Sequence, residues 1–167
     1  RAAWWLHIAG ILVFLNYLYF SKHLHILLAF PNTYFVDLNA KGKLNNLESV
    51  TNEVKLMMDP SADPFAAPAN PEAVPAKFGA SDVQDLNWVQ LLNAYSCTEC
   101  GRCTSSCPAN QTGKKLSPRK IMMDTRDRLE EVGRNIDLNK GVFVDDGKSL
   151  LNDYITPEEL WACTTCN

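Results

Sequence analysis

Six cysteines fall in two tight groups in the second half of the chain. The first group, CTECGRCTSSCPAN, places Cys97, Cys100 and Cys103 three residues apart and ends in Cys107 followed by Pro108. Three thiolates at this interval can wrap one iron–sulfur cubane, and a fourth cysteine before proline ligates the other cluster where two are present. Zinc is the alternative, but structural zinc sites use separated Cys-x-x-Cys pairs or include histidine. The run therefore predicts a 4Fe–4S cluster.

The second group is Cys163 and Cys166, at the end of the stretch ELWACTTC. By the two-cluster rule, Cys107 joins this pair on one cluster, and the other three cysteines hold the first. Two cubanes with four thiolates each need more cysteines than the six present. We therefore expect each cluster to lack one ligand here and the sequence to be a fragment of a longer chain. A further Cys is expected three residues after Cys166, and a Cys-Pro four residues beyond that.

The three histidines of the chain, His7, His23 and His25, all lie in an apolar N-terminal stretch. Ionisable residues at membrane depth are functional candidates, and histidine is a common axial ligand of haem iron. On one straight helix His7 and His25 share a face and lie about 27 Å apart, which predicts ligands to two stacked haem b groups. The second ligand of each haem would come from other helices or subunits. His23 is a third candidate on nearly the opposite face, and the alternative is that the histidines simply lie at the membrane interface.

From Ala2 to Phe30 the only formal charge is Lys22, and this stretch exceeds the roughly 20 apolar residues that a spanning helix needs. We therefore expect one transmembrane helix in residues 1–36. A signal peptide is disfavoured by the length of the run and by the lack of a small-residue cleavage site. Lysines after the span favour a cytoplasmic side for the C-terminal part of the chain, in agreement with the reducing compartment that free thiolates need. The expected location is the inner (cytoplasmic) membrane.

The rest of the chain divides into a linker, residues 37–80, and a helical domain, residues 81–167. The five prolines between Met57 and Ala80 exclude helix interior and central strand and predict a semi-extended spacer, preceded by a short helix over Val50–Met58. The domain is expected to be mainly α, with helices that begin at capping sequences. These starts are SDVQ (81–84), Ser117–Pro118 with an end at Gly133, and Thr156–Pro157 with Glu159.

The domain resembles the α-helical ferredoxin module of the heterodisulfide reductase family and of succinate dehydrogenase iron–sulfur subunits. This likeness rests on the first cysteine run, on LSPRKIMMDTRDRLEEVG (116–133) and on ELWACTTC (159–166). The N-terminal helix is similar to the last helix of the nitrate reductase gamma-subunit family of di-haem cytochromes b, where two haem-ligating histidines have the spacing of His7 and His25. Together they resemble membrane-bound heterodisulfide-reductase-like iron–sulfur oxidoreductases, which implies further membrane helices upstream and a cysteine-rich catalytic region downstream.

The predicted function is membrane-bound electron transfer between a cytoplasmic partner and the quinone pool, through two 4Fe–4S clusters and haem b. The resemblance implies a partner such as electron-transferring flavoprotein, with menaquinone as acceptor. The formal net charge of −3 gives no indication of a nucleic-acid surface. Two alternatives stay open: a thiol/disulfide reductase with its catalytic region outside this chain, and a membrane-anchored iron–sulfur redox sensor.

Overall fold

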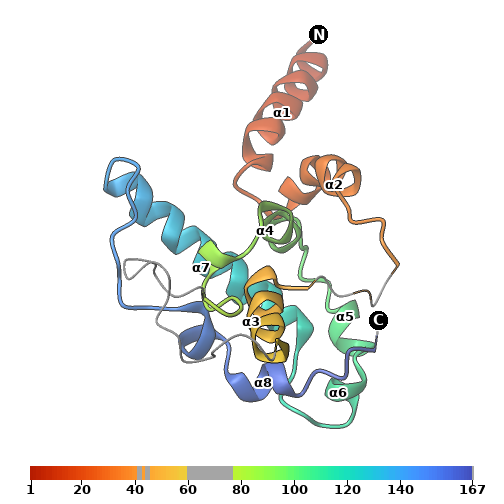
Figure 1. Cartoon of the computed structure of the whole chain (residues 1–167). Coiled ribbons are helices and arrows are strands. Elements are labelled where there is room, and N and C mark those ends of the chain that lie inside the picture. Colours follow the sequence, from red (N-terminus) through yellow and green to blue (C-terminus); the bar gives the residue numbers. More distant parts are fainter. Residues whose placement is uncertain (41–42, 44–45, 60–76, 167) are drawn as a thin grey trace.

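The computed structural model describes residues 1–40, 43, 46–59 and 77–166. These residues form helices and short helical turns but no strand (Figure 1), so the mainly α fold is confirmed. The α-helices are α1 (Ala2–Leu18), α2 (His25–Tyr34), α3 (Glu48–Met58), α4 (Trp88–Tyr95), α5 (Arg102–Ser105), α6 (Pro108–Gln111), α7 (Pro118–Leu138) and α8 (Pro157–Trp161). Shorter turns are η1 (Lys22–Leu24), η2 (Val83–Asp85) and η3 (Leu150–Tyr154).

The apolar N-terminal stretch is broken rather than continuous. Helices α1 and α2 meet at 90°. Within the described residues, no single helix is long and apolar enough to cross a membrane. The bent pair meets that requirement only when its two helices are counted together, by length and composition alone. The break lies at Ser21, whose extended backbone and side chain cap η1: its hydroxyl donates to the Leu18 carbonyl at 3.1 Å and accepts from the His23 amide at 3.2 Å. The stretch therefore forms two helices rather than the one continuous helix predicted, because a capped turn competes with helix continuation.

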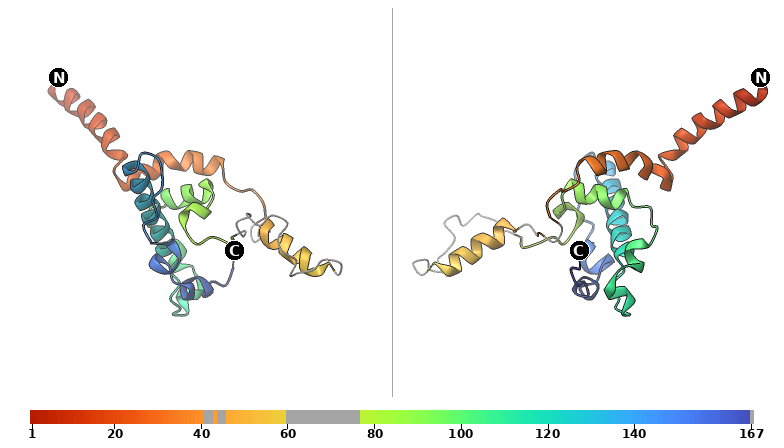
Figure 2. Two further views of the ribbon diagram at one scale, coloured as in Figure 1. Left: turned by 60° about the vertical axis from the view of Figure 1, so that its left-hand side comes forward. Right: turned by 90° about the vertical axis from the view of Figure 1, so that its right-hand side faces the viewer.

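Contacts with α4 hold α2 in its bent direction. Asn32 donates a 2.8 Å hydrogen bond to the Ser96 hydroxyl, and the rings of Phe35 and Trp88 meet edge to face with centroids 4.7 Å apart. Helix α1 projects away from the other helices (Figure 2) and exposes most of its apolar side chains. Helix α2 thus packs against the domain through α4, while α1 extends beyond it.

The helix that leads into the first cysteine run begins later than the capping sequence at 81–84 predicts. Asp82 caps only the turn η2, and α4 starts after Asn87, which forms a capping box with Gln90 through bonds of 2.8 and 2.9 Å. Asp82 is also engaged by Arg128 of α7, 46 residues along the chain. A tertiary contact therefore fixes this turn.

The short helix expected at Val50–Met58 is confirmed as α3, and most of the proline-rich spacer, residues 60–76, lies outside the described residues.

Helix α7 is the longest element of the domain. It begins, as predicted, with Ser117 as the cap and Pro118 in the first turn, but it continues past Gly133 to Leu138. The chain turns left-handed after the C-cap, at Lys140 (φ 58°) and Gly141 (φ 93°), and the Gly141 amide bonds the Ile136 carbonyl at 2.9 Å. The predicted end at Gly133 is wrong, because a glycine ends a helix only where its backbone turns left-handed.

Substitution of Gly133 with alanine is expected to raise the free energy of unfolding by about 0.8 kcal/mol, because alanine loses less backbone entropy than glycine within a helix. A Cβ at this position would meet no atom within 4 Å. Chemical denaturation of the variant beside the unaltered protein measures the gain. A loss of stability would contradict the open space at this position.

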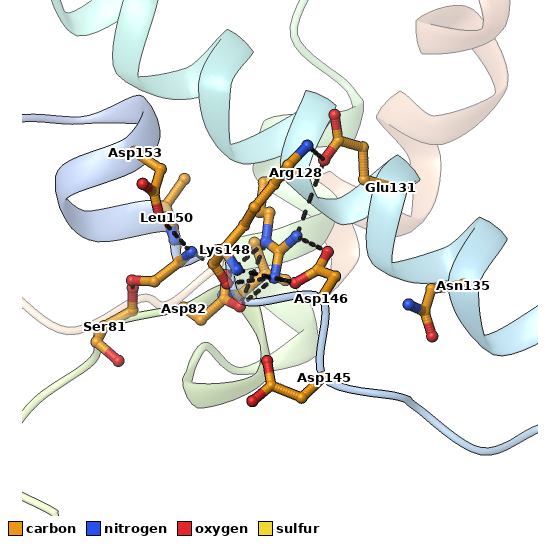
Figure 3. A network of polar contacts seen from close by, with 12 residues as sticks. Ser81, Asp82, Arg128, Glu131, Asn135, Asp145, Asp146, Lys148, Leu150 and Asp153 are labelled. Atoms are coloured by element: carbon orange, nitrogen blue, oxygen red, sulfur yellow. Dashed lines mark hydrogen bonds and ion pairs between the residues drawn. The ribbon is translucent and has the colours of Figure 1, made fainter.

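The centre of the domain is a polar network around Arg128 (Figure 3), whose side chain is fully buried. Its guanidinium donates to both carboxylate oxygens of Asp82 at 2.8 to 3.3 Å and to Asp146 at 2.5 and 3.0 Å. A further bond of 2.8 Å reaches the Lys148 carbonyl. The network ties α7 to the segment before α4 and to the loop before η3.

The network also predicts how stability depends on acid. The hydrogen bonds from Arg128 lower the pKa of Asp146 from 3.8 to about 2. Because the folded pKa lies below the unfolded one, this carboxylate stabilises the fold fully above pH 4 and ceases to do so as the pH falls towards 2. The stability difference between the unaltered protein and Asp146→Asn should therefore shrink across that range. Thermal unfolding of both proteins from pH 7 down to about pH 2 measures it, and a constant difference would contradict the shifted pKa.

Candidate iron–sulfur sites

The first cysteine run leaves the end of α4 and turns sharply twice. Cys97 follows directly after α4 and its C-cap, and the chain then passes through left-handed conformations at Glu99 (φ 58°) and Gly101 (φ 78°). Glycine adopts such a conformation without the penalty that a Cβ brings. The short helix α5 carries Cys103, and Cys107 is the N-cap of α6, where Pro108 occupies the first turn. The run is thus a compact loop of two single-turn helices.

Helix α7 anchors this loop at two points. Near its start, the Thr104 hydroxyl lies 3.1 Å from the Ser117 hydroxyl and accepts from the Arg119 amide at 3.1 Å. Two turns further on, the Arg126 guanidinium bonds the Glu99 carboxylate at 2.9 Å. Thr104 lies between the third and fourth cysteines of the run, and Glu99 between the first and second. Sequence spacing alone did not reveal these anchors, because their partners lie 13 to 27 residues away.

The second cysteine pair follows α8, which begins as the sequence predicts. Thr156 and Glu159 form a capping box, and Pro157 lies in the first turn. Two lysines then connect α8 to the α6–α7 loop and to the first turn of α7: Lys115 of the loop bonds Glu158 at 2.5 Å, and Lys120 of α7 lies 3.1 Å from Glu159. The Thr156 amide, followed by the Lys120 ammonium, lowers the pKa of Glu159, so this buried carboxylate stays ionised. These contacts bring the second motif to the domain that carries the first.

All six cysteines are free thiols, and four of them are exposed. The backbone amide of Arg102 lowers the pKa of Cys100 and favours its thiolate, the form that binds metal. Across residues 1–40, 43, 46–59 and 77–166, no three histidine, cysteine or carboxylate side chains lie close enough together to hold a single metal ion. The donor set nevertheless fits an iron–sulfur cluster, because every candidate ligand is a sulfur on a short loop with backbone amides nearby.

The histidines do not share the arrangement that a straight helix predicts. His7 lies exposed on α1, whereas His23 and His25 lie at the start of the bent second half, with ring centroids 6.4 Å apart. The Nδ1 of His25 lies 2.7 Å from the Lys22 carbonyl, a contact that fixes the ring orientation. The expected alignment of His7 and His25 on one helix face is thus wrong for the bent pair. Their role as ligands stays a prediction.

An open cavity of about 790 Å³ is lined by residues of this bend, of the first cysteine run and of α7. Its walls include Lys22 and His25 of the bend together with Cys97, Glu99 and Arg126. Charged side chains of both signs line it, so it differs from the mostly apolar pockets that hold small organic ligands. The cavity shows that the Arg126 side chain and the first cysteine run face the same space.

Residues 96–167 match the family of the 4Fe-4S dicluster domain. The chain is 32% identical to a probable iron-sulfur-binding oxidoreductase, FadF, of Bacillus subtilis, over 98% of this chain and 24% of that protein. It is 28% identical to the EtfAB:quinone oxidoreductase of Syntrophomonas wolfei, over 99% of this chain and 22% of that protein. A probable membrane-anchored ferredoxin of Chromohalobacter salexigens is 30% identical over 54% of this chain and 15% of that protein. No solved structure is significantly similar.

The chain spans about a quarter or less of the length of these curated relatives. The family match and the names of the relatives agree with the predicted iron–sulfur and oxidoreductase character, whereas the heterodisulfide-reductase and nitrate reductase gamma resemblances stay predictions. Residues 96–167 are therefore similar to 4Fe-4S dicluster domains, and the whole chain is similar to part of larger iron–sulfur oxidoreductases.

Proposed function

We propose that this chain is the electron-transfer segment of a membrane-bound oxidoreductase that passes electrons between electron-transferring flavoprotein and quinone. Cys97, Cys100 and Cys103 would hold one 4Fe–4S cluster, and Cys107 would join Cys163 and Cys166 on the other. The clusters supply one-electron redox chemistry when bound. The protein's own residues position the thiolates, adjust the charge around them and join the two sites in one fold.

One observation carries this proposal: both cysteine groups are fixed to the same helix, α7. Thr104 and Glu99 attach the first run to α7, and Lys120, in the first turn of α7, bonds Asp124 and lies 3.1 Å from Glu159 of α8. A shared rigid scaffold supports transfer between two clusters, because it fixes their separation. The EtfAB:quinone oxidoreductase relative supports flavoprotein and quinone as partners.

The membrane part of the proposal rests on the bent helix pair and on the membrane-anchored ferredoxin relative. Helix α1 would enter the bilayer, with the iron–sulfur domain on the cytoplasmic side, and menaquinone as the acceptor. Haem b would be held by His7 or His25, with His23 as a third candidate and the second ligands from helices outside this chain. The contact between His25 Nδ1 and the Lys22 carbonyl supports this role, because haem and metal ligands commonly use such a bond to fix the free nitrogen.

The test is purification of the full-length protein in detergent under anaerobic conditions. Iron, acid-labile sulfide and pyridine haemochrome are measured first, followed by electron transfer from reduced electron-transferring flavoprotein to a menaquinone analogue. The proposal expects two clusters of about four irons each, haem b and quinone reduction. Absence of sulfide would refute the cluster sites, and clusters without haem would refute only the histidine ligands. Turnover of a disulfide in place of quinone would identify the reductase alternative.

A further inference from the structure

The sequence of the first cysteine run contains one charge between its first two thiols, Glu99. This residue is held in the left-handed region with φ of 58°. A non-glycine residue in this conformation costs about 1 to 2 kcal/mol, and it persists only where surrounding contacts fix it. One contact of its side chain is the 2.9 Å bond to the Arg126 guanidinium.

Arg126 is well suited to act on the cluster loop. Its side chain is only 24% exposed, and it belongs to the rigid helix α7 rather than to the loop itself. Its guanidinium also lies 3.4 Å from Asp127, which is 58% exposed. Cys97, Glu99 and Arg126 line the same open cavity. The pair therefore lies beside the position that the first cluster would take.

We propose that Arg126 is a positioning residue that neutralises Glu99 and so sets the reduction potential of the cluster held by Cys97, Cys100 and Cys103. This inference rests on the clusters of the proposed function. Reduction adds one electron to the cluster and makes it more negative. A neighbouring unpaired carboxylate opposes that step, and a neighbouring cation favours it. The ion pair keeps the loop between Cys97 and Cys100 free of net charge.

Substitutions at the two partners distinguish charge compensation from simple anchoring of the loop. If the pair acts through its charges, removal of Arg126 and removal of Glu99 should shift the midpoint potential of the first cluster in opposite directions. Arg126→Gln leaves Glu99 unpaired, and the midpoint potential of the first cluster should become more negative. Glu99→Gln removes the negative charge from the loop and leaves the guanidinium with only the exposed Asp127 as a partner, so the potential should become more positive. The double variant and Arg126→Lys should both stay near the unaltered value. If the pair only anchored the loop, every one of these variants except Arg126→Lys would shift the potential in the same direction.

A matched control is Arg134→Gln on the same helix, where the arginine bonds Glu130 at 3.1 Å and is 72% exposed. Its removal should leave both potentials unchanged. The experiment is a potentiometric titration of the full-length protein, followed by low-temperature electron paramagnetic resonance, with iron content measured for each variant. If Arg126→Gln does not retain its cluster, a negative shift or no shift in Glu99→Gln alone still overturns the inference.

Shifts of opposite sign for Arg126→Gln and Glu99→Gln, confined to one cluster, support the inference. Shifts of the same sign, or no shift while both clusters are present, would overturn it and leave the proposed function intact. If the unaltered protein holds no cluster, the proposed function and this inference fail together.

Discussion

Replacement of Arg128 with alanine is expected to lower the free energy of unfolding by about 3 kcal/mol, the low end for breaking a buried ion pair. The side chain is fully buried, so its removal leaves a cavity and takes away every hydrogen bond that the guanidinium donates. Asp82 and Asp146 then lose their partner at 17% and 24% exposure. Partial access to water limits the penalty for the two carboxylates, which is why the low end applies.

Two further variants test the cause of this loss. Arg128→Lys keeps the positive charge but not the planar fork that bonds two carboxylates and a carbonyl at once, so an intermediate loss is expected. Arg134→Ala removes an exposed ion pair on the same helix and should change stability by less than about 0.5 kcal/mol. Denaturant unfolding of the three variants measures these differences. A loss below about 1 kcal/mol for Arg128→Ala would show that the network does not hold the domain together.

Substitution of Cys107 with serine is expected to remove one whole cluster, about four irons, and to leave the cluster of its sequence neighbours in place. Cys107 caps α6, beyond the end of α5, and so leaves the loop that holds the other three cysteines of its run. If Cys107 serves the same cluster as Cys163, the Cys107→Ser/Cys163→Ser double variant loses no more iron than either single variant. Cys107→Ser combined with Cys100→Ser should lose both clusters.

Iron and acid-labile sulfide analysis of the full-length protein, with electron paramagnetic resonance to identify the surviving cluster, gives the answer. Ser106→Ala serves as the control, because it alters the neighbouring residue without touching a thiol. The assignment of Cys107 to the cluster of Cys163 and Cys166 would be contradicted if Cys107→Ser and Cys100→Ser removed the same cluster. Retention of all iron in Cys107→Ser would show that this thiol is not a ligand.

The sequence by itself determined the chemistry of the candidate sites and the local starts of several helices. The spacing of the cysteines predicted iron–sulfur character, which the dicluster domain match and the oxidoreductase relatives confirm. The caps at Ser117 and Thr156 were correct, because each depends on bonds within one turn of the chain. A short stretch of sequence contains all the residues that form such a cap, so the start of the helix can be predicted from it.

Only the tertiary structure decided features that depend on distant partners. Apolar composition predicted one helix, but the stretch bends by 90°; the cap at Ser21 is local, whereas the contact between α2 and Ser96 at the end of α4 joins residues 64 apart. Asp82 became a partner of Arg128 instead of the start of a long helix, and Gly133 became an interior residue of α7. The Glu99–Arg126 pair joins residues 27 apart. Neither periodicity nor capping patterns encode such pairs, because they form only when separate helices pack together.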